Sequence, residues 1–136
     1  MKIRNLLLIM GSVVAVGCGH LPSVSGTYSG KLQSSSGEAM VHVTITEVRQ
    51  ALSGTAQASG LEFMPRSYYV IGSQADNGTV ELEISLNYVS GNESGGVIGA
   101  CAYHLVGSGD RAGIAGTYST HGCANGSTGT FALTAQ

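Results

Sequence analysis

Tryptophan is absent from the sequence, proline occurs twice in 136 residues, and charged side chains make up only 10%. After residue 17, four basic residues remain against eight acidic ones, so this part carries a net charge of −4. Proteins that bind nucleic acid need clustered Lys and Arg to meet the phosphates. Docking on anionic lipid head groups by charge needs the same residues. We therefore expect no nucleic-acid partner and no electrostatic docking on membranes.

Catalytic patterns are missing as well. The nucleophile pattern Gly-x-Ser-x-Gly does not occur, and the stretch 26–30 places its serine at the wrong spacing. The carboxylates Glu81 and Glu83 stand two residues apart, as on the solvated face of a strand, and not as an acid/base pair. We expect no enzymatic activity, no catalytic residue, no metal and no cofactor. The alternative is an enzyme whose site assembles from scattered residues such as His104, His121 and Asp110.

The first eighteen residues have the layout of a secretory signal. Lys2 and Arg4 precede the apolar run Leu6–Val16, and the small Gly17 stands before Cys18. The run has eleven residues, whereas a membrane-spanning helix needs about 20. We therefore expect residues 1–17 to be removed as a signal peptide and the protein to be exported.

The sequence Ala15-Val16-Gly17-Cys18 resembles the lipobox of bacterial lipoproteins, in which small residues precede an invariable cysteine. Alanine three places before the cysteine is less usual there than leucine. The resemblance implies cleavage before Cys18, a diacylglycerol thioether on its sulfur, and a further acyl chain such as palmitate on the new N-terminus. Two or more acyl chains hold a protein stably on a membrane. The alternative is an ordinary secretory signal cut elsewhere, with Cys18 left as a thiol.

Gly19 follows the cysteine, and resemblance to the sorting rule of enteric bacteria then favours the outer membrane of the envelope. We expect residues 18–23 to form a short lipidated tether and residues 24–136 to form a single β domain. Glycine-rich turns separate short apolar–polar alternations, which are typical of strands. The expected strands lie at 24–33, 39–48, 51–58, 66–74, 79–89, 97–107, 113–120 and 127–135.

Residues 79–88 give the clearest strand. Leu82 and Ile84 alternate there with Glu81 and Glu83. A strict period of two means one buried face and one solvated face. We therefore expect the two apolar side chains in the core and the two glutamates in water.

Eight short antiparallel strands in about 110 residues can close into an up-and-down barrel, which leaves no strand edge exposed. The strand openings Gly26-Thr27-Tyr28 and Gly116-Thr117-Tyr118 are similar to those of small avidin-like and lipocalin-like barrels. The resemblance implies an all-β meander barrel whose interior is filled by side chains or holds one small ligand. Avidin-type pockets are walled by tryptophan, which is absent here, so no binding residue is carried over. A β-sandwich is the alternative fold.

Cys101 and Cys123 are the cysteines that remain once the first one is lipidated. In an exported protein, an even pair of cysteines predicts a disulfide. A hairpin that turns near residue 110 would place Cys101 opposite residue 119, at the same end of the barrel as Cys123. We therefore expect the two to be joined.

Zinc is the alternative for these cysteines, because His104 and His121 add two imidazoles of a suitable kind. Residues 101 and 104 face opposite sides of a strand, however, which argues against a common metal. His42 has no local partner in the sequence, and we expect it on the surface.

Tyr28, Tyr103 and Tyr118 fall on expected strands with the parity of their apolar neighbours, so we expect them to face the interior. A buried tyrosine with a paired hydroxyl is ordinary core, but the same rings can line a cavity for a small ligand. Two functions stay open: a non-enzymatic binding or scaffold module that meets an envelope protein or small ligand, and an enzyme. The absence of nucleophile and metal motifs favours the module.

Overall fold

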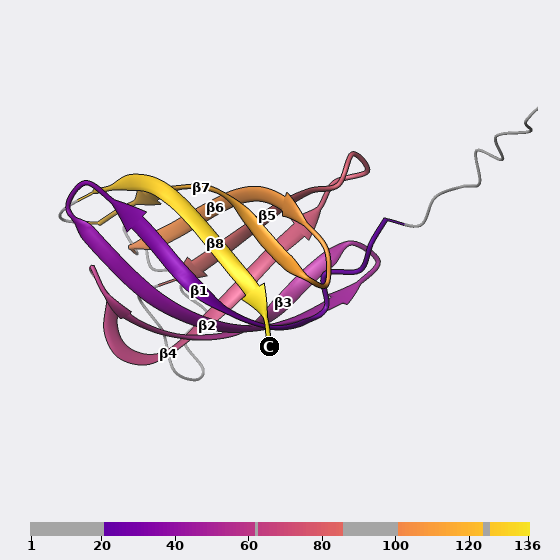
Figure 1. Cartoon of the computed structure of the whole chain (residues 1–136), viewed down its shortest axis with the longest axis horizontal. Helices are drawn as coiled ribbons and strands as arrows, with labels where there is room; N and C mark the ends of the chain where they lie inside the picture. The colour runs from indigo at the N-terminus through magenta and orange to yellow at the C-terminus, as the bar shows by residue number, and fades with distance from the viewer. Residues whose placement is uncertain (1–20, 62, 86–100, 124–125) are drawn as a thin grey trace, which may run out of the picture.

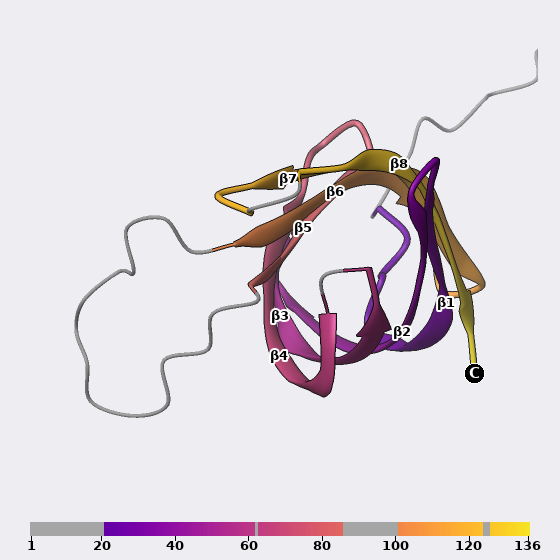
Figure 2. The same ribbon diagram turned by 90° about the vertical axis from the view of Figure 1, so that its left-hand side faces the viewer.

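Eight antiparallel strands follow one another around a closed barrel (Figures 1 and 2). The computed structural model describes residues 21–61, 63–85, 101–123 and 126–136. The strands are β1 (Gly26–Ser34), β2 (Gly37–Val48), β3 (Ala51–Gly60), β4 (Phe63–Gln74), β5 (Thr79–Ser85), β6 (Ala102–Gly109), β7 (Gly113–His121) and β8 (Thr128–Ala135). Within these residues, no helix is long and apolar enough to cross a membrane.

The barrel confirms the predicted fold class. Each strand pairs with the next one in the chain, and β1 pairs with β8 to close the ring, so the two-sheet sandwich does not form. The predicted strands match the observed ones to within about three residues wherever the structure describes them, as expected of assignments from pattern alone. Residues 86–89 and 97–100, which the sequence also assigns to strands, lie outside the described residues.

The barrel has two distinct ends. At one end of the barrel β1 begins and β8 ends. The turns at 49–50, 75–78 and 110–112 lie at the same end, which we call the terminal end. The backbone N–H of Gln136 donates to the Thr27 carbonyl oxygen at 2.9 Å and holds the C-terminus there. The opposite end holds the turn at 35–36 and Leu61 together with Cys101 and Cys123; we call it the disulfide end.

Alternation along the strands fills the interior with apolar side chains. On β5, Leu82 and Ile84 are each 1% exposed, whereas Glu81 is exposed and Glu83 is half-buried. This confirms the predicted faces of that strand. Other large core residues come from the remaining seven strands: Tyr28, Leu32, Val43, Leu52, Tyr68, Val70, Tyr103, Leu105, Ile114, Tyr118, Phe131 and Leu133.

Glycines on the inward face allow the strands to bend sharply around the barrel. A Cβ at Gly30 would overlap the Ala132 carbonyl oxygen, and a Cβ at Gly116 would overlap the Val106 carbonyl oxygen. Glycine inside a strand marks such close backbone approach. Gly116 lies in the middle of β7, so Gly116-Thr117-Tyr118 does not open a strand as the sequence predicts.

Candidate functional site

A row of uncharged polar side chains crosses the outer wall of the barrel from β1 to β4. Ser29 is the register partner of His42, His42 of Gln57, and Gln57 of Ser67. Each of these positions alternates with inward-facing residues, so the four side chains point outward together. We call this set the polar row.

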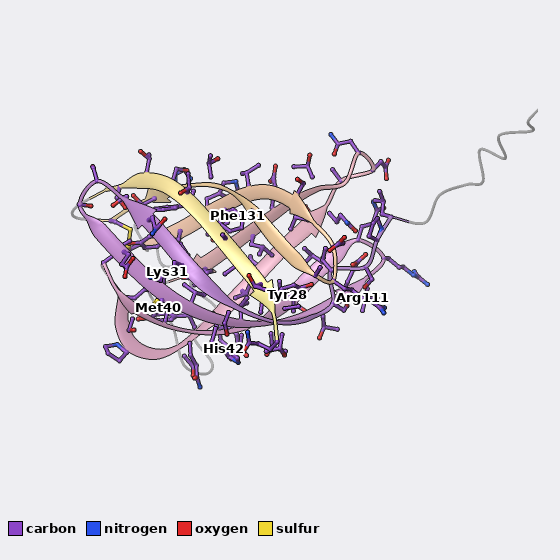
Figure 3. All side chains as sticks on the ribbon, viewed as in Figure 1. Tyr28, Lys31, Met40, His42, Arg111 and Phe131 are labelled. Carbon is purple, nitrogen blue, oxygen red and sulfur yellow. A yellow bond between two sulfur atoms is a disulfide. The ribbon has the colours of Figure 1, made fainter. Side chains whose placement is uncertain are left out.

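A groove of about 480 Å³ lies along the polar row and is open to solvent. Met40 and Pro65 border it, and the backbone of β2 and β3 at Val41 and Ala58 forms its floor. Met40 is 49% exposed, which makes it one of the few large apolar side chains on the outside of the described barrel. Figure 3 shows Met40 and His42 on this wall. The pairing of β3 with β4 shifts near Gly60, and such irregularities bend a strand locally.

The polar row holds one short hydrogen bond, between Ser29 Oγ and His42 Nδ1 at 2.6 Å. A serine–histidine pair supports acyl transfer when a third group orients the imidazole and hydrogen-bond donors are placed to stabilise the oxyanion. Glu38, two residues beyond Met40 on the same face of β2, instead forms an ion pair with Lys31 at 3.4 Å. Among the described side chains that line the groove, none is a carboxylate, a lysine or an arginine. The arrangement is suited to hydrogen bonding and apolar contact.

The three predicted interior tyrosines face the core, but they do not share one site. Tyr28, Tyr103 and Tyr118 are at most 3% exposed. Tyr103 packs against Phe63 at 4.4 Å and against Tyr118 at 5.4 Å between ring centroids. On β8, the register partners of Tyr28 and Tyr118 are Ala135 and Gly129, which places the two tyrosines roughly 20 Å apart along that strand. The rings therefore form two separate groups of core contacts.

Tyr28 sits beneath the terminal end. Its hydroxyl donates to the Val24 carbonyl oxygen at 2.8 Å and lies 3.2 Å from the Asp110 carbonyl oxygen. Burial raises the pKa of the Tyr28 hydroxyl above its ordinary value, and the negative charge of Asp110 raises it further. The neutral phenol is therefore the form that the fold favours.

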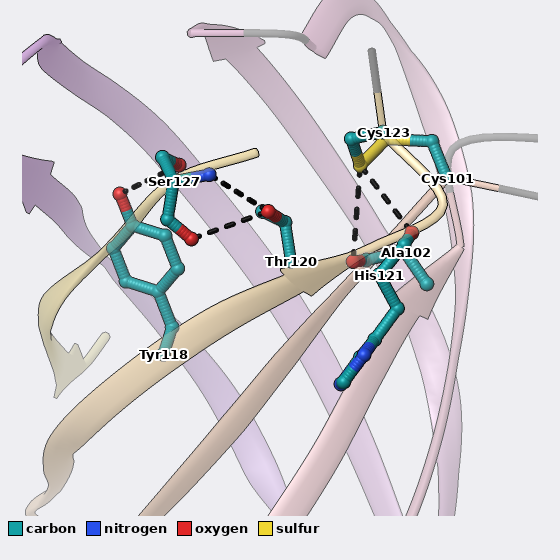
Figure 4. Close-up of a disulfide and its surroundings, with 7 residues drawn as sticks. All are labelled: Cys101, Ala102, Tyr118, Thr120, His121, Cys123 and Ser127. Carbon is teal, nitrogen blue, oxygen red and sulfur yellow. Dashed lines mark hydrogen bonds between the residues drawn. A yellow bond between two sulfur atoms is a disulfide. The ribbon is translucent and has the colours of Figure 1, made fainter. Parts of the chain in front are cut away.

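Cys101 and Cys123 are joined as a disulfide at the opposite end, as the sequence predicts (Figure 4). Their Cα atoms lie 4.4 Å apart. The predicted register of the hairpin is wrong by three residues, because β6 pairs Ala102 with His121 and the residue opposite Cys101 is thus beyond residue 119. The hairpin is centred between Arg111 and Ala112 and not at residue 110. Cys123 therefore lies nearly opposite Cys101.

His104 and His121 approach each other on the outside of β6 and β7, with ring centroids 5.9 Å apart. His104 Nε2 also lies 3.9 Å from a carboxylate oxygen of Glu81. Asp110 does not join them, because it lies at the terminal end, six residues from His104 and about 20 Å along the hairpin. Among the described residues, no three His, Cys, Asp or Glu side chains form a group that could hold a metal.

A second, smaller groove of about 270 Å³ runs beside these residues over β4, β5 and β6. Ile71, Glu81, Glu83 and His104 line it, and Ile71 is 59% exposed. This wall combines acidic and apolar side chains, whereas none of the described residues that line the groove along the polar row is acidic. The two grooves thus differ in the chemistry they offer.

The polar row is a feature that sequence reasoning missed. The alternation around His42 indicates an outward side chain, as found, but Gln57 and Ser67 have no distinctive motif. The sequence feature that could have revealed the row is the pair of two-residue turns at 35–36 and 49–50, because these turns fix the registers of β1–β2 and β2–β3. Reading the register across those turns would have aligned the first three members of the row.

Cys18, the predicted lipidation site, lies outside the described residues, as do the signal peptide and the first part of the tether. Comparison with protein-family models, curated proteins and solved structures finds no match to this chain.

Proposed function

We propose that the protein is a lipid-anchored barrel of the bacterial envelope that acts as a non-enzymatic binding or scaffold module. The anchor is inferred from Lys2, Arg4 and the lipobox-like sequence that ends at Cys18. Export fits the disulfide between Cys101 and Cys123, since disulfides persist outside the reducing cytosol. On the basis of Gly19, we propose the outer membrane as the location of the protein.

The observation that carries the binding role is the contrast between the interior and the outer wall. Apolar side chains from all eight strands pack the interior, and its tyrosines make contacts with one another or with backbone oxygens. Hydrogen-bonding side chains gather on the outer wall in the polar row, beside exposed Met40. We propose this groove as the contact surface for an uncharged, partly apolar segment of an envelope protein.

Two alternatives have less support. A small ligand enclosed by Tyr28, Tyr103 and Tyr118 would require these rings to separate from the contacts that bury them. For Ser29 and His42 to act in catalysis, a carboxylate would have to orient the imidazole of His42. Glu38, which lies on the same face of β2, forms an ion pair with Lys31 instead. Neither alternative draws on the polar row as a whole.

A photocrosslinking experiment tests the proposed contact surface. A photoreactive amino acid is placed at Gln57 in the groove, or at Thr117, an exposed position on the outer face of β7, in the lipidated protein within its native envelope. We expect a discrete crosslinked protein from Gln57, identified by mass spectrometry and reduced when Met40→Ser or His42→Ala is added, and none from Thr117. Equal crosslinking from both positions, or none from Gln57, would argue against the groove as the contact surface.

A further inference from the structure

We propose that the terminal end of the barrel is a membrane-facing surface whose partner is the head-group layer of the lipid bilayer. The inference rests on the proposed function, because it requires the acyl chains on Cys18. It adds which end of the barrel, and which side chains, meet the lipid.

The segment that leads from the anchor is fastened to this end. Val24 is fully buried, its N–H donates to Glu47 Oε2 at 2.9 Å, and its carbonyl oxygen accepts the Tyr28 hydroxyl at 2.8 Å. Gln74, itself 2% exposed, donates from Nε2 to the Pro22 carbonyl oxygen at 3.1 Å. Contacts to β1, β2 and β4 thus fix the direction from which the chain enters the barrel (Figure 1).

The chain between this fastening and the anchor is short. Three peptide steps separate Leu21 from Cys18, and at about 3.3–3.6 Å each they span at most about 11 Å. Strands of 9–12 residues, tilted as in small barrels, separate the two ends of the barrel by roughly 20–30 Å. A lipid on Cys18 therefore keeps the terminal end near the head groups, while the disulfide end lies well beyond the reach of the tether.

The side chains at the terminal end suit that position. Val48 is 63% exposed, and Arg49 next to it is exposed as well. Arg111 is exposed on the 110–112 turn at the same end of the barrel (Figure 3). Asp76 and Asp110, the acidic residues of the turns, each accept a hydrogen bond from a turn residue, at 3.0 and 2.7 Å. Basic and apolar side chains together favour the head-group region. Because the mature chain is acidic overall, the lipid supplies the affinity and these residues supply the orientation.

Two of these turns are also linked to each other. Arg49 and Gln50 both have positive φ, 51° and 66°, as a tight two-residue hairpin requires. Gln50 accepts the Gln74 N–H at 2.8 Å and donates from Nε2 to the Gln74 carbonyl oxygen and to Asp76 at 3.0 Å. These bonds hold the β2–β3 turn against the β4–β5 turn, so Arg49 projects from a fixed base.

Single tryptophans test the orientation directly, because the chain contains none. Four variants of the acylated full chain are reconstituted into phospholipid vesicles that carry a quencher on the head group. They are A75W at the terminal end, S35W at the disulfide end, and T55W and T117W on opposite walls; all four positions are exposed. Each variant is also reconstituted into vesicles that carry no quencher, which gives its unquenched emission.

We expect A75W to lose most of its emission, S35W to keep it, and the two wall variants to be quenched weakly and equally. Quenching of S35W as strong as that of A75W, or strongest quenching at one wall, would overturn the terminal-end orientation while leaving the anchor in place. Failure of the unsubstituted protein to float with the vesicles would instead overturn the lipid anchor, and the orientation with it.

Discussion

Tyr28 shows how a single residue connects the barrel core to the segment that leads out of it. The ring is fully buried, and the hydroxyl donates to the backbone of Val24. Burial favours the neutral hydroxyl, which raises its pKa. The same residue thus contributes to core packing and to the attachment of the chain at the terminal end.

The Y28F variant should lose about 1–3 kcal/mol of unfolding free energy, because the Val24 carbonyl oxygen loses its hydroxyl donor while remaining buried. Urea titration at neutral pH measures this change. A variant as stable as the natural protein would mean that the hydrogen bond from the Tyr28 hydroxyl makes no net contribution to the free energy of unfolding.

The raised pKa of Tyr28 also predicts a dependence on alkaline pH. Its contribution to stability is fully present below the unfolded pKa of about 10 and is lost as pH rises through the higher folded value. The stability difference between the natural protein and Y28F should therefore shrink above about pH 10. Urea midpoints measured for both proteins at stepwise higher pH check this, and a constant difference would contradict it.

The faces of β5 give a second test at the residue scale. L82A and I84A should each cost about 2–5 kcal/mol, through lost apolar transfer and the cavity left behind, because both residues are buried. E81Q and E83Q, on the outer face, should change stability by about 0.5 kcal/mol or less. Thermal unfolding of the four variants gives the ranking, and costly glutamates with tolerant apolar positions would reverse the assigned faces.

At the scale of the strand, inward glycines determine where the barrel bends. Gly30 faces the core between Tyr28 and Leu32, and its α-carbon lies close to the backbone of β8. No side chain can occupy that space without moving β1 away from β8. This pair of strands is the one that closes the barrel.

The G30A variant should therefore lose at least about 1–3 kcal/mol, since the added methyl group overlaps the Ala132 carbonyl oxygen. Gly78 provides the matched control, because nothing lies within 4 Å of a Cβ there and its φ of 87° is tolerated best by asparagine among other residues. G78N should stay within about 1 kcal/mol. Thermal unfolding followed by circular dichroism compares G30A with G78N. Equal losses of stability in both variants would show that the close approach of β1 to β8 does not contribute to the cost of G30A.

The disulfide joins the start of β6 to the chain just after β7. Its 22-residue separation gives about 3 kcal/mol in the chain-entropy account of cross-links. The C101S/C123S variant should lose about that much unfolding free energy and therefore melt at a lower temperature. A reducing agent should lower the melting temperature of the natural protein but not of the variant. Peptide mapping without reduction should recover the two cysteines joined. Free thiols with one equivalent of zinc would contradict the disulfide.

The strands could be predicted from the sequence because alternation is a local property, and Leu82, Ile84 and their neighbours display it within one strand. The polar row could not be predicted in the same way. Its four members come from four strands, and the alignment of Gln57 with Ser67 depends on a β3–β4 register that shifts near Gly60. The three-residue register error opposite Cys101 has a similar cause: the glycines on either side of Arg111 do not indicate where the hairpin turns.

At the scale of the molecule, the barrel separates three roles in space. The interior is packed and supplies stability. The wall of β1–β4 carries the groove and the polar row, which we propose as the partner surface. The terminal end, reached by a tether only a few residues long, faces the lipid in our account, and this leaves both the wall and the disulfide end accessible from the surrounding space.

The anchor is the premise that connects these roles, and the covalent state of Cys18 tests it most directly. The protein is extracted with detergent from envelope membranes, and its N-terminal peptide is analysed by mass spectrometry beside that of C18S. The account predicts a chain that begins at Cys18 and carries a diacylglycerol thioether with a further acyl chain, and an unprocessed precursor for the variant. A chain that begins at another residue, or a Cys18 that bears a free thiol, would contradict the account.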